Sequence, residues 1–235
     1  MRNSRRFPLR QRSQLLLLFA YGFAATLAVF YGLVVRQDLI VTFFAFHILV
    51  CMGIPLVHGW LEGNLLRHWK AAWGRFEPQG ARLGLLLGAI LMVGLAAGLW
   101  LLIRAEGRAD SIRGILQHWG LEGNWVWLFC LYLVAVNSLL EELMWRGFVL
   151  QRLQLVASRP AAVLLSSFFY SLYHLVIGSV LFGLVWGIFI TLLVFASGVL
   201  WGWMKGLFPE VYPTWFSHLL ADAGIALIVL WIFRS

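Results

Sequence analysis

The sequence predicts an all-α bundle of about seven helices that cross a membrane. Apolar runs of about 18 or more residues recur along the chain, and each is long enough for a hydrocarbon core of about 30 Å. Hydrophobic residues make up 62% of the 235 residues and charged residues only 12%, whereas a soluble domain carries about 25% charged residues. The composition is therefore that of a multi-pass integral membrane protein, and no soluble domain is left over.

Seven spans fit the hydropathy best, within a range of six to eight. They are expected near residues 14–35, 39–60, 83–103, 124–145, 161–178, 181–204 and 213–233. A cytoplasmic N-terminus is expected, because this orientation places 13 of the 18 Lys and Arg residues on the inner side. We treat the chain as a single membrane domain in two parts: N-terminal helices over 1–123, and a core over 124–235 that holds the candidate catalytic residues.

Two smaller patterns concern how the spans are connected and packed. The segment from Glu62 to Arg82 mixes Leu and aromatic residues with basic ones, which is typical of a helix lying in the membrane interface. Glycines at helical spacing resemble the small-residue contacts between membrane helices. They are Gly84, Gly88, Gly94 and Gly98 in the third span, and Gly198 and Gly202 in the sixth.

The net charge of +8 does not indicate a nucleic-acid partner. The basic residues cluster between the apolar runs, where they match membrane topology and anionic lipid headgroups. Cys51 and Cys130 lie within apolar segments and show neither a disulfide framework nor metal-ligand spacing. The expected surroundings are membrane lipids, and no nucleic acid is expected to bind.

Ionisable residues with catalytic spacing lie inside three of the apolar segments. The fourth span contains Glu141, Glu142 and Arg146, the fifth contains His174, and the seventh contains His218 and Asp222. An ionisable group at bilayer depth costs roughly 2.5 to 3.5 kcal/mol on insertion scales, so it is seldom present without a function or a partner. We therefore expect the three segments to meet at one polar site.

Helical spacing gives these residues different expected roles. Glu142 lies four residues before Arg146, so an ion pair within the helix is expected. Glu141 points about 100° away and has no basic partner on its own helix, which leaves it available for chemistry. His174 lies as far beyond the turn at Ser158 as Glu142 lies before it, which predicts that Glu141 and His174 are at matching depth.

Two mechanisms fit this set of residues. A desolvated carboxylate beside a histidine can take a proton from water, and the hydroxide can then attack an amide carbonyl. His218 is expected to support the oxyanion that forms. Alternatively, Glu141, His174 and His218 are ligands that Zn²⁺ accepts, with water in the fourth position. No cofactor is favoured from the residues, zinc remains possible, and the spacing does not separate the two mechanisms.

The three motifs together resemble the CAAX-protease and bacteriocin-processing (CPBP, Abi) family of intramembrane endopeptidases, and are similar to its Rce-type glutamic members. The resemblance covers about residues 124–233. It rests on Glu141-Glu142-x-x-x-Arg146, on Tyr170-x-x-x-His174 and on His218-x-x-x-Asp222. It implies that Glu141 and His174 activate water. It also implies that His218 and residue 222 support the oxyanion, and that Glu142 and Arg146 brace the helix.

Two positions depart from the family pattern. Tyr170 stands where phenylalanine is usual, so its additional hydroxyl needs a partner. Asp222 stands where asparagine is frequent, and it can donate a hydrogen bond only when protonated; otherwise it orients His218. Elsewhere, His47 and His58 are expected to be packing or interfacial residues, and His68 and His118 to lie in loops.

The expected function is hydrolysis of a peptide bond near the membrane face. The substrate would be a peptide or protein with a lipidated C-terminus, a processed peptide, or the C-terminal sorting tail of an exported protein. Two other classes of function use the same residues. One is a non-enzymatic immunity or scaffold protein that keeps the polar network for structure. The other is a proton-coupled transporter using Glu141 and His174, but the chain lacks paired broken helices in matching halves.

Overall fold

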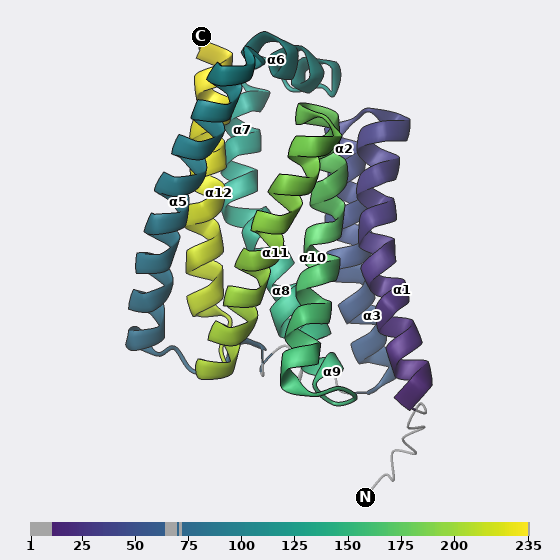
Figure 1. Ribbon diagram of the computed structural model, residues 1–235. Helices are drawn as coiled ribbons and strands as arrows, with labels where there is room; N and C mark the ends of the chain where they lie inside the picture. The colour runs from purple at the N-terminus through teal and green to yellow at the C-terminus, as the bar shows by residue number, and fades with distance from the viewer. Residues whose placement is uncertain (1–10, 64–69, 71, 235) are drawn as a thin grey trace, which may run out of the picture.

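The computed structural model describes residues 11–63, 70 and 72–234, and within these residues the chain forms a helical bundle without strands (Figure 1). Seven of its helices are long and apolar enough to span a membrane, as predicted. They are Gln14–Arg36, Leu39–Leu61, Pro78–Glu106, Trp125–Leu153, Arg159–Phe182, Leu184–Leu207 and Tyr212–Arg234. The third and fourth are longer than expected. The third begins early because Pro78 opens the helix, a position where its missing N–H is not needed.

The seven spans comprise α-helical and π-helical segments. The first contains α1 (Gln11–Phe30) and η1 (Tyr31–Arg36), and the second contains α2 (Leu39–Phe43), η2 (Phe44–Gly53) and α3 (Ile54–Leu61). The fourth consists of α7 (Trp125–Tyr132), η3 (Leu133–Asn137), α8 (Ser138–Met144), η4 (Trp145–Val149) and α9 (Leu150–Leu153). The others are α5 (Pro78–Glu106), α10 (Arg159–Phe182), α11 (Leu184–Leu207) and α12 (Tyr212–Arg234), and α6 (Ala109–His118) connects the third span to the fourth. Two π-helical segments thus flank α8; such turns are frequent at functional sites.

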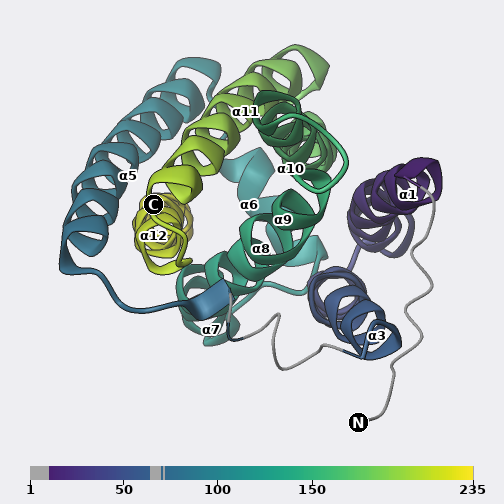
Figure 2. The same cartoon turned by 90° about the horizontal axis from the view of Figure 1, so that it is seen from below.

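The fourth span lies between two packed pairs of helices. Helix α12 packs along α5, and α10 packs along α11 and against α1. Seen from below, the segments of the fourth span run from beside α12 to beside α10, while α1 and α3 stand on the side away from α5 (Figure 2). The described N-terminal end and the turn between α9 and α10 lie at one end of the bundle, and the C-terminus lies at the other (Figure 1).

Close packing of α5 on α12 depends on glycine. A Cβ atom added to Gly84 would collide with the carbonyl oxygen of Pro213, and one added to Gly88 would lie 2.9 Å from α12. These two glycines therefore make the predicted small-residue contact. Gly94 and Gly98 do not, because a Cβ at either position would meet nothing within 4 Å. The prediction was wrong for this second pair, which lies on a face of α5 away from its neighbour.

Helices α10 and α11 form a hairpin through Gly183, whose φ of 84° is in the left-handed region that favours glycine. Gly198 faces Ser167, with 3.1 Å between a built Cβ and the serine Cβ, and Gly202 faces Val163 at 2.8 Å. The two predicted small-residue positions of the sixth span are therefore contacts with α10. They bring α11 close enough for its later residues to reach the polar centre.

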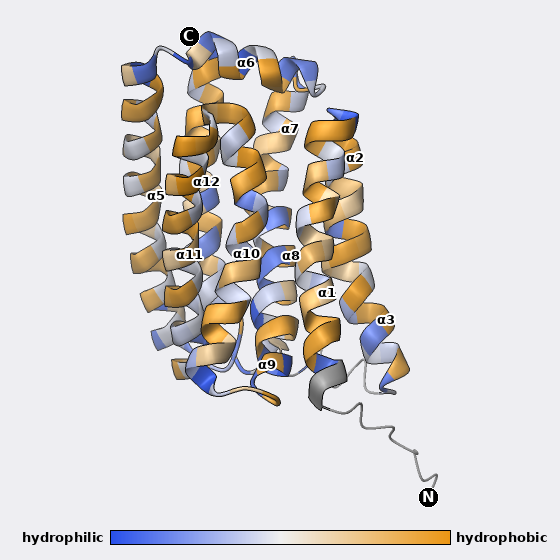
Figure 3. Cartoon of the chain, turned by 45° about the vertical axis from the view of Figure 1, so that its right-hand side comes forward, coloured by the Kyte–Doolittle hydropathy of each residue, from blue (hydrophilic) through white to orange (hydrophobic). Residues whose placement is uncertain are grey.

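The outer surface of the bundle is apolar and the polar residues lie inside (Figure 3). Helices α5 and α11 are mostly exposed. In the most apolar 18-residue stretch of each helix, 11% of α5 and 17% of α11 is buried, compared with 50% in α10 and in α12. Hydrophilic residues appear on α8 and α12 within the bundle (Figure 3). The three spans that hold the predicted catalytic residues on α8, α10 and α12 are thus more buried than α5 and α11.

The connections differ in part from expectation. His118 does not lie in a loop but ends α6, an amphipathic helix at the C-terminal end of the bundle, and its Nε2 lies 2.9 Å from Gln37 Oε1. Part of the predicted interfacial helix between Glu62 and Arg82, residues 64–69 and 71 with His68 among them, lies outside the described residues, and from Pro78 the segment belongs to α5. Within it, Trp73 is described and stacks edge-on against Trp215 of α12.

Candidate active site

The polar centre is built on one face of α8. Glu141 and Glu142 are almost fully buried, with exposed fractions of 3% and 0%. This face packs against α12, which contributes His218 and Asp222, exposed to 2% and 5%. Glu141 therefore faces the interior of the bundle and not lipid, as the in-membrane penalty on a carboxylate requires.

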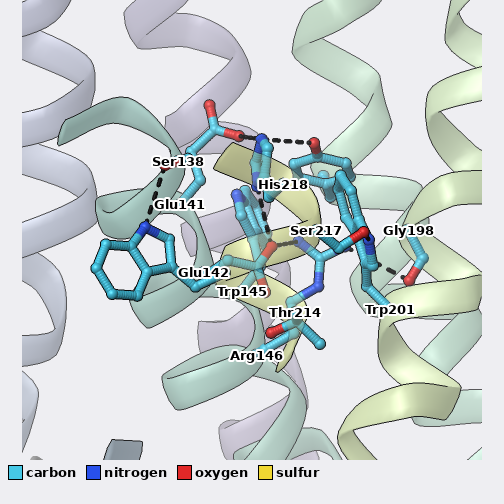
Figure 4. A network of polar contacts seen from close by, with 12 residues as sticks. Ser138, Glu141, Glu142, Trp145, Arg146, Gly198, Trp201, Thr214, Ser217 and His218 are labelled. Carbon is cyan, nitrogen blue, oxygen red and sulfur yellow. Dashed lines mark hydrogen bonds and ion pairs between the residues drawn. The ribbon is translucent and has the colours of Figure 1, made fainter. Parts of the chain in front are cut away.

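His218 is held between the two adjacent glutamates (Figure 4). Its Nδ1 lies 3.0 Å from Glu142 Oε1. Its Nε2 lies 3.7 Å from Glu141 Oε2 and 3.6 Å from Asp222 Oδ1. The imidazole stacks on the Trp201 ring with 4.6 Å between centroids. Because Glu142 accepts a hydrogen bond at Nδ1, Nε2 is the nitrogen that faces the other two acids.

The ion pair predicted between Glu142 and Arg146 is present. Arg146 Nη1 donates to Glu142 Oε1 over 2.9 Å, and Nη2 lies 3.4 Å from the Gly198 carbonyl. The guanidinium also lies 4.4 Å from the Tyr170 ring centre and 5.0 Å from that of Trp201, within the range of cation–π attraction. Arg146 thus links α8, α10 and α11 around the carboxylate that holds His218.

The additional hydroxyl of Tyr170 has a partner at this site. Its oxygen lies 3.4 Å from His218 Nε2, at the long end of hydrogen-bond distances. The Tyr170 ring packs edge-on against the imidazole of His218 and against Trp201. Tyrosine therefore fills the place of a phenylalanine ring and adds a polar group that faces the same nitrogen as Glu141 and Asp222.

One oxygen of Glu141 has no hydrogen-bond partner among the described residues, although it is buried. The Tyr173 hydroxyl is likewise buried without a partner at strict hydrogen-bond geometry, and it lies close enough to Glu141 to interact with its carboxylate. Buried polar atoms are nearly always hydrogen-bonded, so each exception needs an explanation. A carboxylate oxygen that no side chain occupies is available for a reacting molecule.

His174 is placed differently from expectation. Its Nδ1 lies 3.0 Å from the Tyr170 carbonyl oxygen and so donates to it, which leaves Nε2 as an acceptor. Among the described histidines, the one within 4.0 Å of Glu141 is His218 and not His174. Matching depth does not fix helix rotation, and successive residues point about 100° apart. Tyr173, the preceding residue, is the one that approaches Glu141.

The alternative zinc site is not assembled. In the part of the chain that the structure describes, no three His, Cys, Asp or Glu side chains are grouped as metal ligands. Glu141, His174 and His218, the ligand set expected for zinc, do not converge on one point. As they are placed, these residues do not fit a metal ion.

Sequence reasoning missed two residues that contact the site. Asn137 donates from Nδ2 to Asp222 Oδ2 over 2.9 Å, and its Oδ1 lies 2.8 Å from His47 Nε2. His47 is fully buried and hydrogen-bonded, whereas the sequence suggested a packing residue. The sequence could have indicated Asn137, because it lies one helical turn before Glu141 and so on the same face of the helix. For His47, in the second span, the sequence offered no such indication.

A second polar cluster fixes the end of the fourth span. Arg152 donates to Glu62 over 2.7 Å, and His58 lies 2.9 Å from the other oxygen of Glu62. Burial disfavours the charged form of Glu62, but the nearby Arg152 and His58 outweigh it and lower the pKa of this carboxyl. The cluster joins α9 to the end of α3, and so holds the helix that carries the catalytic candidates against the second span.

Comparison with known proteins gives one family match. Residues 123–224 match the family model described as Rce1-like, type II CAAX prenyl endopeptidase. No curated protein and no solved structure matches the chain. The matched range contains the three motifs with Glu141, His174 and His218, and it excludes His47.

Proposed function

Because residues 123–224 match the family model described as Rce1-like, type II CAAX prenyl endopeptidase, we propose that the chain hydrolyses a peptide bond with water activated by Glu141. The family match supports an intramembrane endopeptidase of the CAAX type. The glutamic mechanism, the roles of single residues and the substrate are our proposal. The observation that carries it is the buried Glu141 carboxylate, whose Oε2 has no hydrogen-bond partner in the described structure and faces His218.

Glu141 acts as the general base. Its carboxylate takes a proton from a water molecule, and the resulting hydroxide oxygen attacks the carbonyl carbon of the scissile amide. The C–N bond breaks when the tetrahedral intermediate collapses, and the proton passes from Glu141 to the leaving amine. His174, whose Nε2 is left as an acceptor, is the second proton acceptor that we assign.

His218 stabilises the oxyanion, and an ionised Asp222 supports it by orienting the imidazole and favouring its charged form. Glu142 fixes the imidazole through Nδ1, and Trp201 fixes the plane of the ring. Because Nδ1 donates to Glu142, Nε2 carries a hydrogen in the imidazolium form of His218, and this hydrogen points toward the space shared by Glu141 and Asp222. A preorganised donor in a water-poor site is worth several kcal/mol at the transition state, because it needs no reorientation when charge develops.

The site lies toward the end of the bundle that carries the N-terminus. His218 is six residues past Tyr212, where α12 begins, so it is about 9 Å into the membrane helix. With the N-terminus in the cytoplasm, as the basic residues favour, the site is nearer the cytoplasmic face. A peptide with a lipidated C-terminal region suits this depth, because its lipid chain keeps the cleavable bond close to the membrane surface.

The substrate proposal is tested with purified protein in liposomes and two synthetic peptides. Both end in Cys and three further residues, and only one carries a prenyl group on the Cys. We expect release of the C-terminal tripeptide from the prenylated peptide at a rate at least about tenfold higher, since burial of the lipid contributes about 0.8 kcal/mol per CH₂. Mass spectrometry of the tripeptide measures both rates.

Two controls separate the alternatives. Incubation with 1,10-phenanthroline is expected to leave the rate unchanged, and a loss that added Zn²⁺ restores would favour the metal mechanism. Absence of any peptide product from either substrate, with folded protein, would favour the non-enzymatic class. Equal rates for the two peptides would contradict the lipid requirement.

A further inference from the structure

We propose that Asn137 and His47 are positioning residues for this reaction, which hold Asp222 through a chain of hydrogen bonds that begins at Tyr132. The inference rests on the proposed function, since Asp222 supports the oxyanion there. It assigns a role to the second span, which lies outside the residues that match the family model.

The chain of contacts is continuous. The Tyr132 hydroxyl lies 2.8 Å from His47 Nδ1, His47 Nε2 lies 2.8 Å from Asn137 Oδ1, and Asn137 Nδ2 lies 2.9 Å from Asp222 Oδ2. Asn137 and His47 are both buried, with exposed fractions of 9% and 0%. All three distances lie in the range of well-formed hydrogen bonds.

The direction of every bond follows from the chemistry at its ends. An ionised carboxylate only accepts, so Asn137 must present its amide N–H₂ to Asp222 and its carbonyl oxygen to His47. His47 must then carry its hydrogen on Nε2 and accept at Nδ1 from the Tyr132 hydroxyl. Each of the three contacts then pairs one donor with one acceptor, and a buried network of this kind fixes side-chain positions.

Ring packing prevents His47 from turning away. Its imidazole lies 4.9 Å from the Phe46 ring, 5.3 Å from Phe43 and 5.4 Å from Tyr132, measured between centroids. The aromatic cage and the two hydrogen bonds therefore hold Nε2 on Asn137. Because its hydrogen bond to Asn137 fixes one Asp222 oxygen, the other stays directed at His218 Nε2, 3.6 Å away.

An exchange of the two side chains tests the link between Asn137 and Asp222. Asn137→Asp places two buried carboxylates about 2.9 Å apart, and we expect kcat to fall about 100-fold or more with KM little changed. The double variant Asn137→Asp with Asp222→Asn restores one amide and one carboxylate. We expect kcat of the double variant to lie within about tenfold of the wild-type value. If the effects of the two single substitutions simply multiplied, the loss of kcat would be larger.

His47 is tested by a conservative pair. Glutamine at position 47 can still donate to the Asn137 carbonyl, whereas phenylalanine fills the aromatic cage without a donor. We expect His47→Phe to lower kcat at least about tenfold more than His47→Gln does. His118→Gln, which changes a histidine at the other end of the bundle, is the matched control and is expected to keep the wild-type rate.

The outcomes distinguish this inference from the proposed function. A folded wild type without peptidase activity overturns the proposed function, whatever the variants do. A different result overturns the coupling of Asn137 to Asp222. In that case the wild type is active and thermal unfolding shows that all variants are folded, but kcat of the double variant is no higher than the product of the two single effects predicts. Equal rates for His47→Phe and His47→Gln, both folded, overturn the role of His47.

Discussion

Replacing Glu141 with glutamine is expected to lower the rate of peptide hydrolysis at least about 1,000-fold while leaving the bundle folded. Glutamine has nearly the size of glutamate but cannot accept a proton from water. Oε2 of Glu141 accepts no hydrogen bond from a described residue, so the exchange removes no such bond at this atom. The measurement is the rate of tripeptide release at saturating prenylated peptide, alongside the thermal unfolding temperature in detergent.

The control for this exchange is Glu122→Gln, which removes a carboxylate exposed at the membrane surface. It is expected to retain the wild-type rate, because Glu122 lies in the connection before the fourth span and contributes nothing to the site. A Glu141→Gln protein that is folded and cleaves at more than about one tenth of the wild-type rate would remove Glu141 from the mechanism.

Replacing Arg146 with leucine is expected to lower the free energy of unfolding by about 3 to 5 kcal/mol. Glu142 is fully buried, and the change would leave its carboxylate without the guanidinium that lies 2.9 Å away. The contacts of Arg146 with the Tyr170 and Trp201 rings would also be lost. Unfolding in mixed micelles, followed by the fluorescence of tryptophan, measures the difference.

A double variant separates charge burial from packing. Removing both charges with Glu142→Leu and Arg146→Leu is expected to be less destabilising than Arg146→Leu alone, because no unpaired charge stays buried. The double variant should still be inactive, since His218 loses the acceptor at Nδ1. If Arg146→Leu changed the unfolding free energy by less than about 1 kcal/mol, the ion pair would not brace the site.

Much of this architecture can be predicted from the sequence, because a segment that crosses a bilayer must be a long and largely apolar helix. The length of the apolar runs and the rarity of charged residues within them predicted seven membrane helices, which the structure contains. Pro78 explains why the third helix begins earlier than predicted. Spacing along one helix was equally reliable: Glu142 pairs with Arg146, and Asp222 lies on the same face as His218. Within a helix, sequence separation alone fixes which side chains meet.

Contacts between helices were predicted less well, because they depend on rotation about each helix axis. His174 and Tyr173 are neighbours in sequence, yet Tyr173 is the one that approaches Glu141. His47 lies 90 residues before Asn137, and only the packing of the second span against the fourth brings them together. Packing of the seventh span against the fourth makes Glu142 a partner of His218 as well as of Arg146. A single sequence contains no signal for such pairs.

The central claim is that water, activated by the buried Glu141 carboxylate, attacks the peptide bond directly. A single-turnover reaction in H₂¹⁸O tests it, with mass spectrometry of the new C-terminal carboxylate. Direct attack predicts one ¹⁸O atom in each product molecule of the wild type and no product from Glu141→Gln. A first-turnover product without ¹⁸O, which would reveal an acyl-enzyme on a protein carboxylate, or labelled product from folded Glu141→Gln at the wild-type rate, would contradict the claim.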